Sequence, residues 1–341
     1  MYLRALIALA VATCWAHATP IGAPSKEQRA KAIVTLLGLD VWLRTERATL
    51  RRYHGRMELS DADDPDVALG VRGEAPILEA CLYRCKDPDL AMSLLRSFPE
   101  LRHLLAGDHR ITDAGVRYLT ALQELRRLDL SQSGITDRGM QYLRNLRELW
   151  ALDLGACHQL SGSSLRYLTG LKHLSSLNLF ALNLTDQDLA QLRGLKELEF
   201  LDLDDTRVGN RGLQELAHLT SLRTLWLSYT KVTAAGLVQL RPLVGLRSLD
   251  LAGLPVGDRD VAGLAAWPRL EKLSLRSTKI TSAAVKPLSS LKALKELNVC
   301  ETHLTAAAIH ALRAARPDLT IIYGTGGHAR TSLPKAPARS R

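Results

Sequence analysis

The chain has 341 residues, of which 46% are hydrophobic and only 5% aromatic, and its formal net charge is +10 at pH 7. This apolar content is ample for a continuous hydrophobic core, which excludes the class of proteins that lack one. Because so few residues are aromatic, leucine must supply most of that core. The positive charge raises the question of a nucleic-acid partner, which depends on where the basic residues lie.

The first eighteen residues, 1–18, are predicted to be a secretory signal peptide. Arg4 gives the segment a positive start, residues 5–12 form a short apolar stretch, and Ala16-His17-Ala18 has the small-x-small pattern of a cleavage site. The stretch is too short to span a bilayer, and no later segment is long and apolar enough. We therefore expect a secreted or periplasmic protein that begins at Thr19. Lipidation of Cys14 and an uncleaved first helix remain as alternatives.

Residues 19–100 are predicted to form a helical N-terminal cap over the open end of the repeats described next. Ser25 can cap a helix that ends at Gly38 or continues through residues 45–54. The remainder is predicted to form one loop and two further helices, at residues 59–65, 74–85 and 88–98.

A pattern L-x-x-L-x-L recurs along residues 101–324, every 24 residues with two single insertions. The nine full copies and a degenerate tenth begin at Leu101, Leu125, Leu149, Leu174, Leu198, Leu222, Leu246, Leu270, Leu294 and Leu319. In the second copy Leu128 and Leu130 alternate with polar neighbours, which predicts a short strand with one buried face. Met140, Leu143 and Leu146 then recur every three residues, which predicts a helical turn on the same core. One unit cannot bury its own apolar face, so neighbouring units must stack.

The helical half of each unit begins with a polar residue and soon reaches a glycine. The polar position is suited to cap the helix and is threonine at Thr112, Thr136, Thr185, Thr233, Thr281 and Thr305. Three residues later, glycine recurs at Gly115, Gly139, Gly212 and Gly236. We expect a close approach between units there, which would favour a missing side chain.

The unit L-x-x-L-x-L-x-x-x-x-I-T-D-x-G-L-x-x-L-x-x-L resembles the leucine-rich-repeat superfamily over residues 101–324. Within it, the chain is similar to the helical-backed kinds, namely ribonuclease-inhibitor-like, cysteine-containing and GALA-type repeats. The resemblance implies an α/β fold, a right-handed solenoid or horseshoe with a parallel concave sheet, convex helices and an N-terminal cap. It also implies that a protein partner binds on the concave face.

One column departs from the asparagine ladder of the commonest repeats. It holds His109, Ser133, Cys157, Leu182, Thr206, Thr230, Leu254, Thr278 and Thr302. Threonine, serine and cysteine can still hydrogen-bond the backbone, whereas the two leucines break the ladder. Cys157 is therefore interpreted as structural. Cys81, Cys85 and Cys300 are interpreted as buried thiols, the first two one helical turn apart, rather than as disulfide or zinc ligands.

The basic residues lie mostly away from the predicted binding face. Residues 1–100 are balanced, the repeats have a small basic excess, and residues 325–341 form what we expect to be a disordered basic tail. The positions that should face the concave surface instead hold Asp129, Asp153, Asp202, Asp204 and Asp250 against Arg276. Such a face repels phosphates, which argues against a nucleic-acid partner there, and no motif supports one on the flank.

Aromatic side chains gather on the concave positions of repeats four to six. They are Phe180, Phe200, Trp226 and Tyr229, with Asp202, Asp204 and Asp205 beside them. Exposed rings among carboxylates are typical of a protein-interaction hot spot, and they predict a partner with a basic or amphipathic element. The plainer alternative is scattered exposure without function. A calcium site at the three aspartates is disfavoured because the run lacks the glycine spacing of calcium loops.

No catalytic motif stands out, so the sequence predicts a non-enzymatic, monomeric binding scaffold without cofactor, metal or transmembrane segment. The alternative that the resemblance implies is a substrate-recognition subunit or effector of F-box or GALA type, acting in ubiquitin ligation. Residues 19–100 lack the leucine-proline opening and trailing tryptophan of an F-box. A purely structural role is the third possibility.

Overall fold

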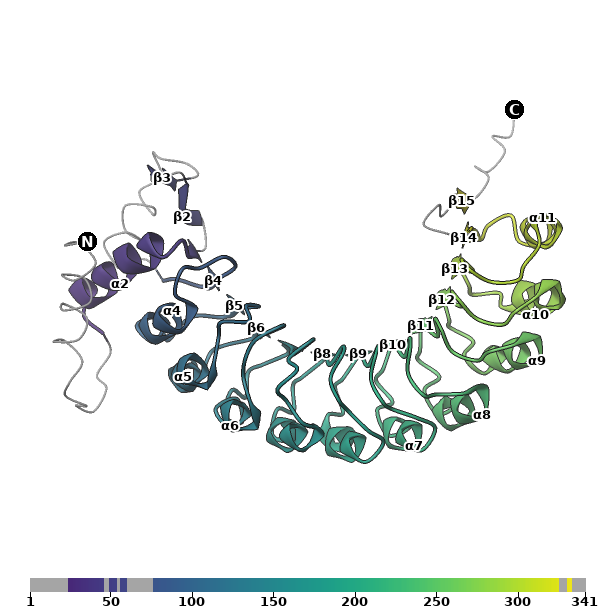
Figure 1. Ribbon diagram of the computed structural model, residues 1–341, viewed down its shortest axis with the longest axis horizontal. Helices are drawn as coiled ribbons and strands as arrows, with labels where there is room; N and C mark the ends of the chain where they lie inside the picture. The colour runs from purple at the N-terminus through teal and green to yellow at the C-terminus, as the bar shows by residue number, and fades with distance from the viewer. Residues whose placement is uncertain (1–23, 46–48, 54–55, 60–75, 325–329, 333–341) are drawn as a thin grey trace.

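A computed structural model describes residues 24–45, 49–53, 56–59, 76–324 and 330–332. They form an open arc in which a sheet lines the concave side and helices line the convex side (Figure 1). The predicted α/β solenoid with a parallel inner sheet is confirmed. The predicted signal peptide and the loop at residues 60–65 lie outside the described residues.

Each repeat contributes one short strand, and successive strands pair in parallel. These strands are β4 (Glu79–Cys81), β5 (His103–Leu105), β6 (Arg127–Asp129), β7 (Ala151–Asp153), β8 (Ser176–Asn178), β9 (Phe200–Asp202), β10 (Thr224–Trp226), β11 (Ser248–Asp250), β12 (Lys272–Ser274), β13 (Glu296–Asn298) and β14 (Thr320–Tyr323). The register never slips, so Leu128 faces Leu152 and then Leu177 along the sheet. Because the middle residue of each strand is buried, its two neighbours face the concave side.

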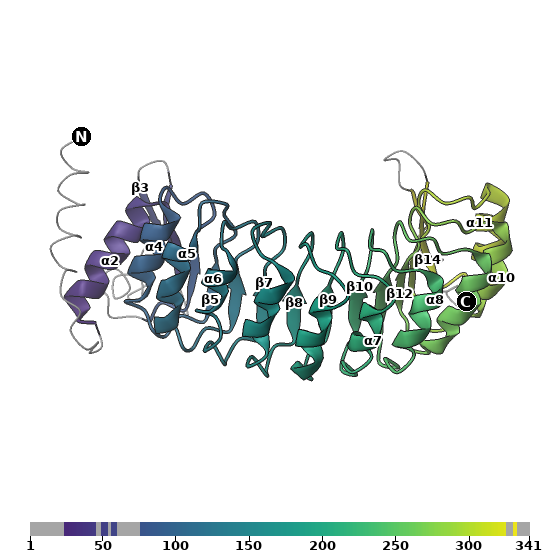
Figure 2. The same ribbon diagram turned by 60° about the horizontal axis from the view of Figure 1, so that its bottom comes forward.

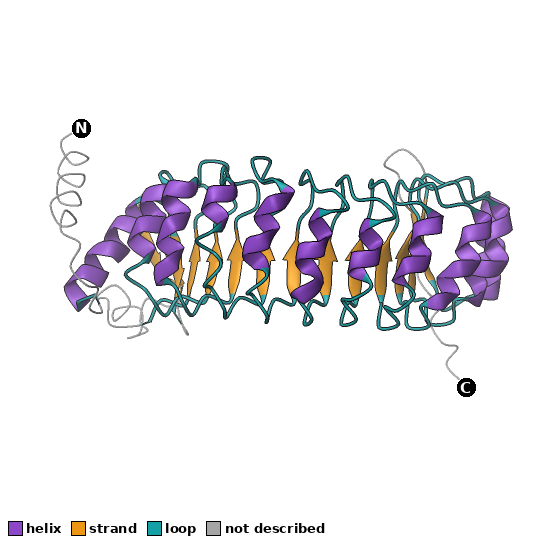
Figure 3. Ribbon diagram, turned by 90° about the horizontal axis from the view of Figure 1, so that it is seen from below, coloured by secondary structure: helices purple, strands orange, loops and turns teal. Residues whose placement is uncertain are grey.

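Helical segments cover the other side of the sheet (Figure 3). In chain order they are α4 (Pro88–Leu95), α5 (Asp113–Val116), η1 (Arg117–Ala121), α6 (Asp137–Met140), η2 (Gly162–Leu168), η3 (Asp188–Gly194), α7 (Gly212–Leu216), α8 (Ala234–Leu237), η4 (Val238–Leu240), α9 (Asp258–Val261), η5 (Ala262–Ala266), η6 (Ser282–Ala284), α10 (Val285–Ser290) and α11 (Ala306–Ala315). Their leucines and those of the strands form one continuous buried core.

The N-terminal region differs in part from the predicted helical cap. Helix α2 (Lys26–Gly38) begins at Ser25 with the predicted cap and packs beside α4 (Figure 2). It does not continue beyond Gly38. The chain instead forms β1 (Trp42–Arg44), β2 (Thr49–Tyr53) and β3 (Arg56–Leu59), which pair antiparallel. Strand β1 then pairs antiparallel with β4 and so joins the main sheet.

The helix predicted for residues 74–85 is wrong, because Glu79–Cys81 is strand β4. The parallel sheet thus extends one 24-residue interval ahead of Leu101, with Ala80 opposite Leu104. Cys81 lies on this strand and Cys85 follows it, so they are not one helical turn apart. Ala80 stands where the L-x-x-L-x-L pattern has its second leucine, so the sequence pattern did not reveal this unit. At the other end, Arg330–Ser332 form β15 on β14, so the predicted basic tail contains a strand.

The threonines and Cys157 of the ladder column hydrogen-bond backbone carbonyls as predicted, whereas Ser133 bonds the sulfur of Cys157 instead. Thr206, Thr230, Thr278 and Thr302 each donate a hydroxyl hydrogen bond to the carbonyl three residues earlier. The buried Cys157 thiol donates to the carbonyl of Leu130, 3.0 Å away in the preceding repeat. Burial raises the pKa of this thiol, which keeps it protonated. Its structural role is therefore confirmed.

Several of the capping threonines also take part in hydrogen bonds that join one repeat to the next. Thr112, Thr136, Thr281 and Thr305 cap their helices as predicted, whereas Thr185 and Thr233 do not. The Asp113 carboxylate of one repeat also accepts the backbone N–H of Thr136 in the next, at 2.8 Å, and its hydroxyl at 2.6 Å. We call this arrangement the Asp–Thr clasp. It recurs between Asp89 and Thr112 and between Asp258 and Thr281.

The clasp explains the recurrent glycine. Gly139 lies against the Asp113 carboxylate, and Gly212 lies so close to Asp186 that a Cβ atom would be 2.8 Å from Oδ1. The expected close approach between units is therefore confirmed, and its partner is the aspartate or asparagine of the preceding repeat.

Replacing Gly139 by alanine is expected to lower the free energy of unfolding by about 2 kcal/mol, since the added methyl must displace a bonded carboxylate. Urea denaturation measures the loss. Gly263→Ala is the matched control, because a methyl group added there would have no atom within 4 Å. Equal stability of the two variants would contradict the clasp as the reason for glycine.

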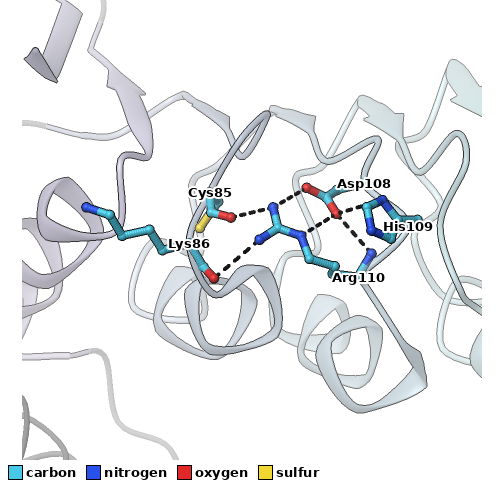
Figure 4. A network of polar contacts seen from close by, with 5 residues as sticks. All are labelled: Cys85, Lys86, Asp108, His109 and Arg110. Carbon is cyan, nitrogen blue, oxygen red and sulfur yellow. Dashed lines mark hydrogen bonds and ion pairs between the residues drawn. The ribbon is translucent and has the colours of Figure 1, made fainter.

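A different network closes the joint where the ladder residue is His109. Arg110 donates from Nη2 to the carbonyl of Cys85 at 2.6 Å and also contacts the carbonyl of Lys86 (Figure 4). Its guanidinium is held by the Asp108 carboxylate, at 2.9 Å from Nε, which lowers the pKa of that carboxyl. Arg110 thus supplies between repeats the hydrogen bonds that His109 does not.

Candidate binding surface on the concave face

The predicted site residues all lie on the concave side or in the turns that directly follow it. Phe200 and Asp202 are the inward-facing residues of β9, and Trp226 is the last residue of β10. Phe180, Asp204, Asp205 and Tyr229 lie in the turns after β8, β9 and β10. We refer to these seven residues as the central patch.

Two of the four rings touch. Phe200 and Trp226 meet edge to face, with ring centroids 5.1 Å apart and planes at 79°, a favoured geometry for an aromatic pair. Trp226 is 36% exposed and Phe180 is 41% exposed. Among the described residues Phe180 has no ring contact, so the sequence grouped it with rings that it does not meet.

Tyr229 is the most exposed ring, at 56%, and its backbone is left-handed with φ of 56°. The same turn position is left-handed in most repeats, and the neighbouring repeat fills it with Gly253. A Cβ atom on Gly253 would lie 2.6 Å from the Tyr229 ring, so the ring lies directly on the glycine backbone. A bulky residue in this backbone conformation lowers the stability of the fold by about 1 kcal/mol or more. The fold does not require tyrosine at this position, since the next repeat has Gly253 there.

The aspartates of the patch have different environments. Asp202 is buried, Asp204 is half-buried and Asp205 is exposed. The Asp202 carboxylate accepts the N–H of Asp204 at 2.9 Å, and Asp204 accepts the N–H of Ser228 at 2.6 Å. Burial, together with neighbouring carboxylates, raises the pKa of Asp202 to about 6 and that of Asp204 to about 7.

No lysine or arginine in the described part of the chain forms an ion pair with Asp202, Asp204 or Asp205. Nearer the two ends of the concave face some of the charges are paired. Glu79 contacts Arg44 at 3.2 Å and His103 at 2.9 Å, and Glu301 contacts Arg276 at 2.8 Å. Asp129, Asp153 and Asp250 on the same inward row likewise have no ion pair among the described residues, so the negative charge without a counter-charge extends from β6 to β11 and includes the central patch.

A second group of apolar side chains lies on the concave face, and the repeat pattern of the sequence does not predict it. Trp42 of β1 lies opposite Cys81, and Cys81 lies opposite Leu105, so the three form one inward row across adjacent strands. Tyr83 follows β4, and Trp42 and Tyr83 are 47% and 45% exposed. We call these four residues the N-terminal patch. Only the antiparallel pairing of β1, which has no repeat pattern, brings Trp42 here.

The repeats that hold the central patch, residues 174–245, are bounded by two joints at which the Asp position of the clasp has no side chain that can accept a hydrogen bond. Gly162 and Ala234 stand where the clasp needs a carboxylate. The next helices therefore use their own residues, with Asp188 accepting from Thr185 and Asp260 from Gly257, both at 2.8 Å. The two ladder leucines lie at the same joints, so these joints have fewer side-chain hydrogen bonds than their neighbours.

No helix within the described residues is long and apolar enough to cross a membrane. The described side chains also include no group of three histidine, cysteine or acidic residues arranged to hold a metal ion.

Comparison with known proteins agrees with the repeat. A family model described as Leucine Rich repeat matches residues 122–143. An internalin, InlF, from Listeria monocytogenes is similar in structure, with a TM-score of 0.54 and 23% identity over 69% of this chain and 72% of that one. The mouse RP105/MD-1 complex gives a TM-score of 0.50 and 18% identity over 66% of this chain and 38% of that one. No curated protein matches. The recurrent strand and helix, the parallel sheet and these likenesses show that the chain has a leucine-rich-repeat fold.

Proposed function

We propose that the chain is an exported, monomeric binding scaffold that takes a protein partner on the central patch and performs no catalysis. The observation that supports this best is the unpaired negative charge of Asp202 and Asp204 directly beside exposed Trp226 and Tyr229. A folded chain gains nothing from such an arrangement, whereas a partner that supplies cations and apolar contacts would stabilise it.

The partner is expected to present a basic or amphipathic element. Trp226 lies between Asp202 and Asp250 along the sheet, as their direct neighbour on adjacent strands. A lysine or arginine placed over its ring would be attracted by the ring face and by both carboxylates. The charge that repels phosphates thus favours a basic protein.

Export rests on the cleavage pattern at Ala16-His17-Ala18. The ubiquitin-ligase alternative has no support from the comparisons. In addition, much of the segment that would dock an adaptor forms β1, β2 and β3 and the first strands of the sheet.

Removal of two rings tests the proposal. Trp226→Ala combined with Tyr229→Ala is expected to reduce recovery of the partner at least about tenfold, because hot-spot side chains contribute about 2 kcal/mol each. Proteins bound to the purified chain are identified by mass spectrometry, and their recovery is compared between variants.

Trp150→Ala is the control, since Trp150 is similarly exposed, at 42%, but follows the first leucine of its repeat and lies outside the patch. It should retain the partner. Full recovery by a folded Trp226→Ala/Tyr229→Ala variant would remove the central patch from consideration.

A further inference from the structure

The N-terminal half of the concave face has two apolar patches with a charged stretch between them. The N-terminal patch occupies the inward row from β1 to β5, and the rings of the central patch lie over β8, β9 and β10 and the turns that follow these strands. Between them the same inward row holds Asp129, Asp153 and Asn178 on successive strands. Tyr83 donates its hydroxyl to the Asp129 carboxylate, so the N-terminal patch adjoins this polar stretch.

The middle of the row remains negative. Asp129 and Asp153 each accept a backbone N–H two residues ahead, and Asn178 donates to Asp153 at 3.1 Å. Neither aspartate forms an ion pair within the described residues. Burial, with the neighbouring Asp129 charge, raises the pKa of Asp153, so an added cation would be favoured there.

The separation of the two patches sets the size of a ligand that reaches both. Strand β10 lies six strands beyond β4, and adjacent strands are about 4.8 Å apart, so the patches are about 29 Å apart along the sheet. An extended peptide advances about 3.3 Å per residue and spans this with about nine residues. The face is concave (Figure 1), so a straight helix of that length would touch it only at the two ends of the helix. An extended chain can instead follow the curve of the face.

We propose that the concave face binds one continuous extended segment of a partner protein, with an apolar side chain at each end and lysine or arginine between them. One end rests on the N-terminal patch and the other on the central patch, and the basic side chains meet Asp129, Asp153 and Asp202. This inference rests on the proposed function and adds a second anchor and a spacing. The complementary charge of the middle selects a basic segment over a neutral one.

Synthetic peptides test the spacing directly. The first has tryptophan at both ends and three lysines alternating with serine between them, about nine residues in all. The second is a five-residue version with one lysine, and the third has glutamate in place of each lysine. Their affinities for the full chain are measured by isothermal titration calorimetry.

The long basic peptide is expected to bind at least about tenfold more tightly than the short one, because its second anchor binds at high effective concentration. Trp42→Ala/Tyr83→Ala should remove this gain and leave the short peptide unaffected. Leu105→Ser, a change inside the repeats, should lower the affinity for the long peptide only. This variant replaces Trp42→Ala/Tyr83→Ala in the test if that double variant does not fold. Trp150→Ala should change neither affinity, and the glutamate peptide should not bind.

Equal affinities of the long and short peptides, both lost in Trp226→Ala/Tyr229→Ala, would overturn the second anchor while leaving the proposed function intact. Absence of binding by either basic peptide would overturn the extended basic ligand, and partner recovery in the preceding experiment then decides the proposed function separately. Self-association of the chain that is abolished by the same substitutions would make a second copy the occupant, and would also overturn the proposal.

Discussion

At pH 7.5 the Asp202→Asn and Asp204→Asn variants are each expected to be more stable than the natural chain, by on the order of 2 kcal/mol. Each carboxylate is ionised at this pH although burial and like charge oppose ionisation. Asparagine retains an oxygen that can accept the N–H groups of Asp204 and Ser228 without the charge. Urea denaturation at fixed salt measures the gain.

The pH dependence gives an independent check of sign. A carboxyl whose pKa is higher in the folded state destabilises the fold when ionised. This cost is complete above the folded pKa, about 7 for Asp204, and disappears as the pH falls towards the unfolded value near 4. The advantage of Asp204→Asn over the natural chain should therefore shrink steadily between pH 7.5 and about pH 4.5.

Asp205→Asn is the control, because Asp205 is exposed in the same turn, and it should change stability by less than about 0.5 kcal/mol. If Asp204→Asn instead destabilises the chain at pH 7.5, the carboxylates are structural. Their unpaired charge would then no longer support a binding role.

The repeat made most of the fold predictable. Every full unit from Leu101 onwards has leucine at the first two positions of the pattern, and only Ala106 and Val299 replace leucine at the third. A short strand of period two followed by a helical turn then buries its apolar face by stacking on its neighbours. The register then fixes which residues face inward, so the spacing of the leucines is enough to place Asp202 and Trp226 on adjacent strands. The capping threonines and the glycine column followed from the same regularity.

Where the pattern lapses, local preference gave the wrong answer. Residues 45–54 are rich in good helix formers, yet β2 lies within them because it pairs with β1 and β3, and β1 in turn pairs with the more distant β4. Ala80 belongs to the sheet through its pairing with Leu104, which no local signal reveals. Trp42 and Tyr83 were missed for this reason, and with them half of the surface proposed to bind the partner.

Side-chain contacts inside the central patch were equally out of reach. Four rings share the concave positions of neighbouring repeats, but only Phe200 and Trp226 touch. Tyr229 lies on Gly253 because a left-handed turn directs it across to the next repeat. Asp204 lacks a counter-charge because no lysine or arginine side chain of the described residues forms an ion pair with it. The spacing of the leucines in the sequence does not determine where those side chains end.

Arg316→Met is expected to destabilise the C-terminal repeats by about 3–5 kcal/mol. Arg316 is almost fully buried, and its guanidinium donates to the carbonyls of Leu291 and Leu294, each at 2.6 Å. It also pairs with Asp318 at 2.7 Å, which lowers the pKa of that carboxyl. Methionine fills similar space but leaves both buried carbonyls without a donor. Amide hydrogen exchange, read repeat by repeat, measures the loss and its location.

Arg313→Met in helix α11, which ends directly before Arg316, is the control. Arg313 has no hydrogen bond or ion pair within the described residues, so this change should be nearly neutral. In a stacked array each repeat contacts only its neighbours. The loss in Arg316→Met should therefore be greatest around β13 and β14 and fade before β10, leaving peptide affinity at the central patch unchanged. Uniform loss of protection from β4 to β14 would show that the array unfolds as one unit. In that case the joints at Gly162 and Ala234 would not separate the binding repeats from the rest.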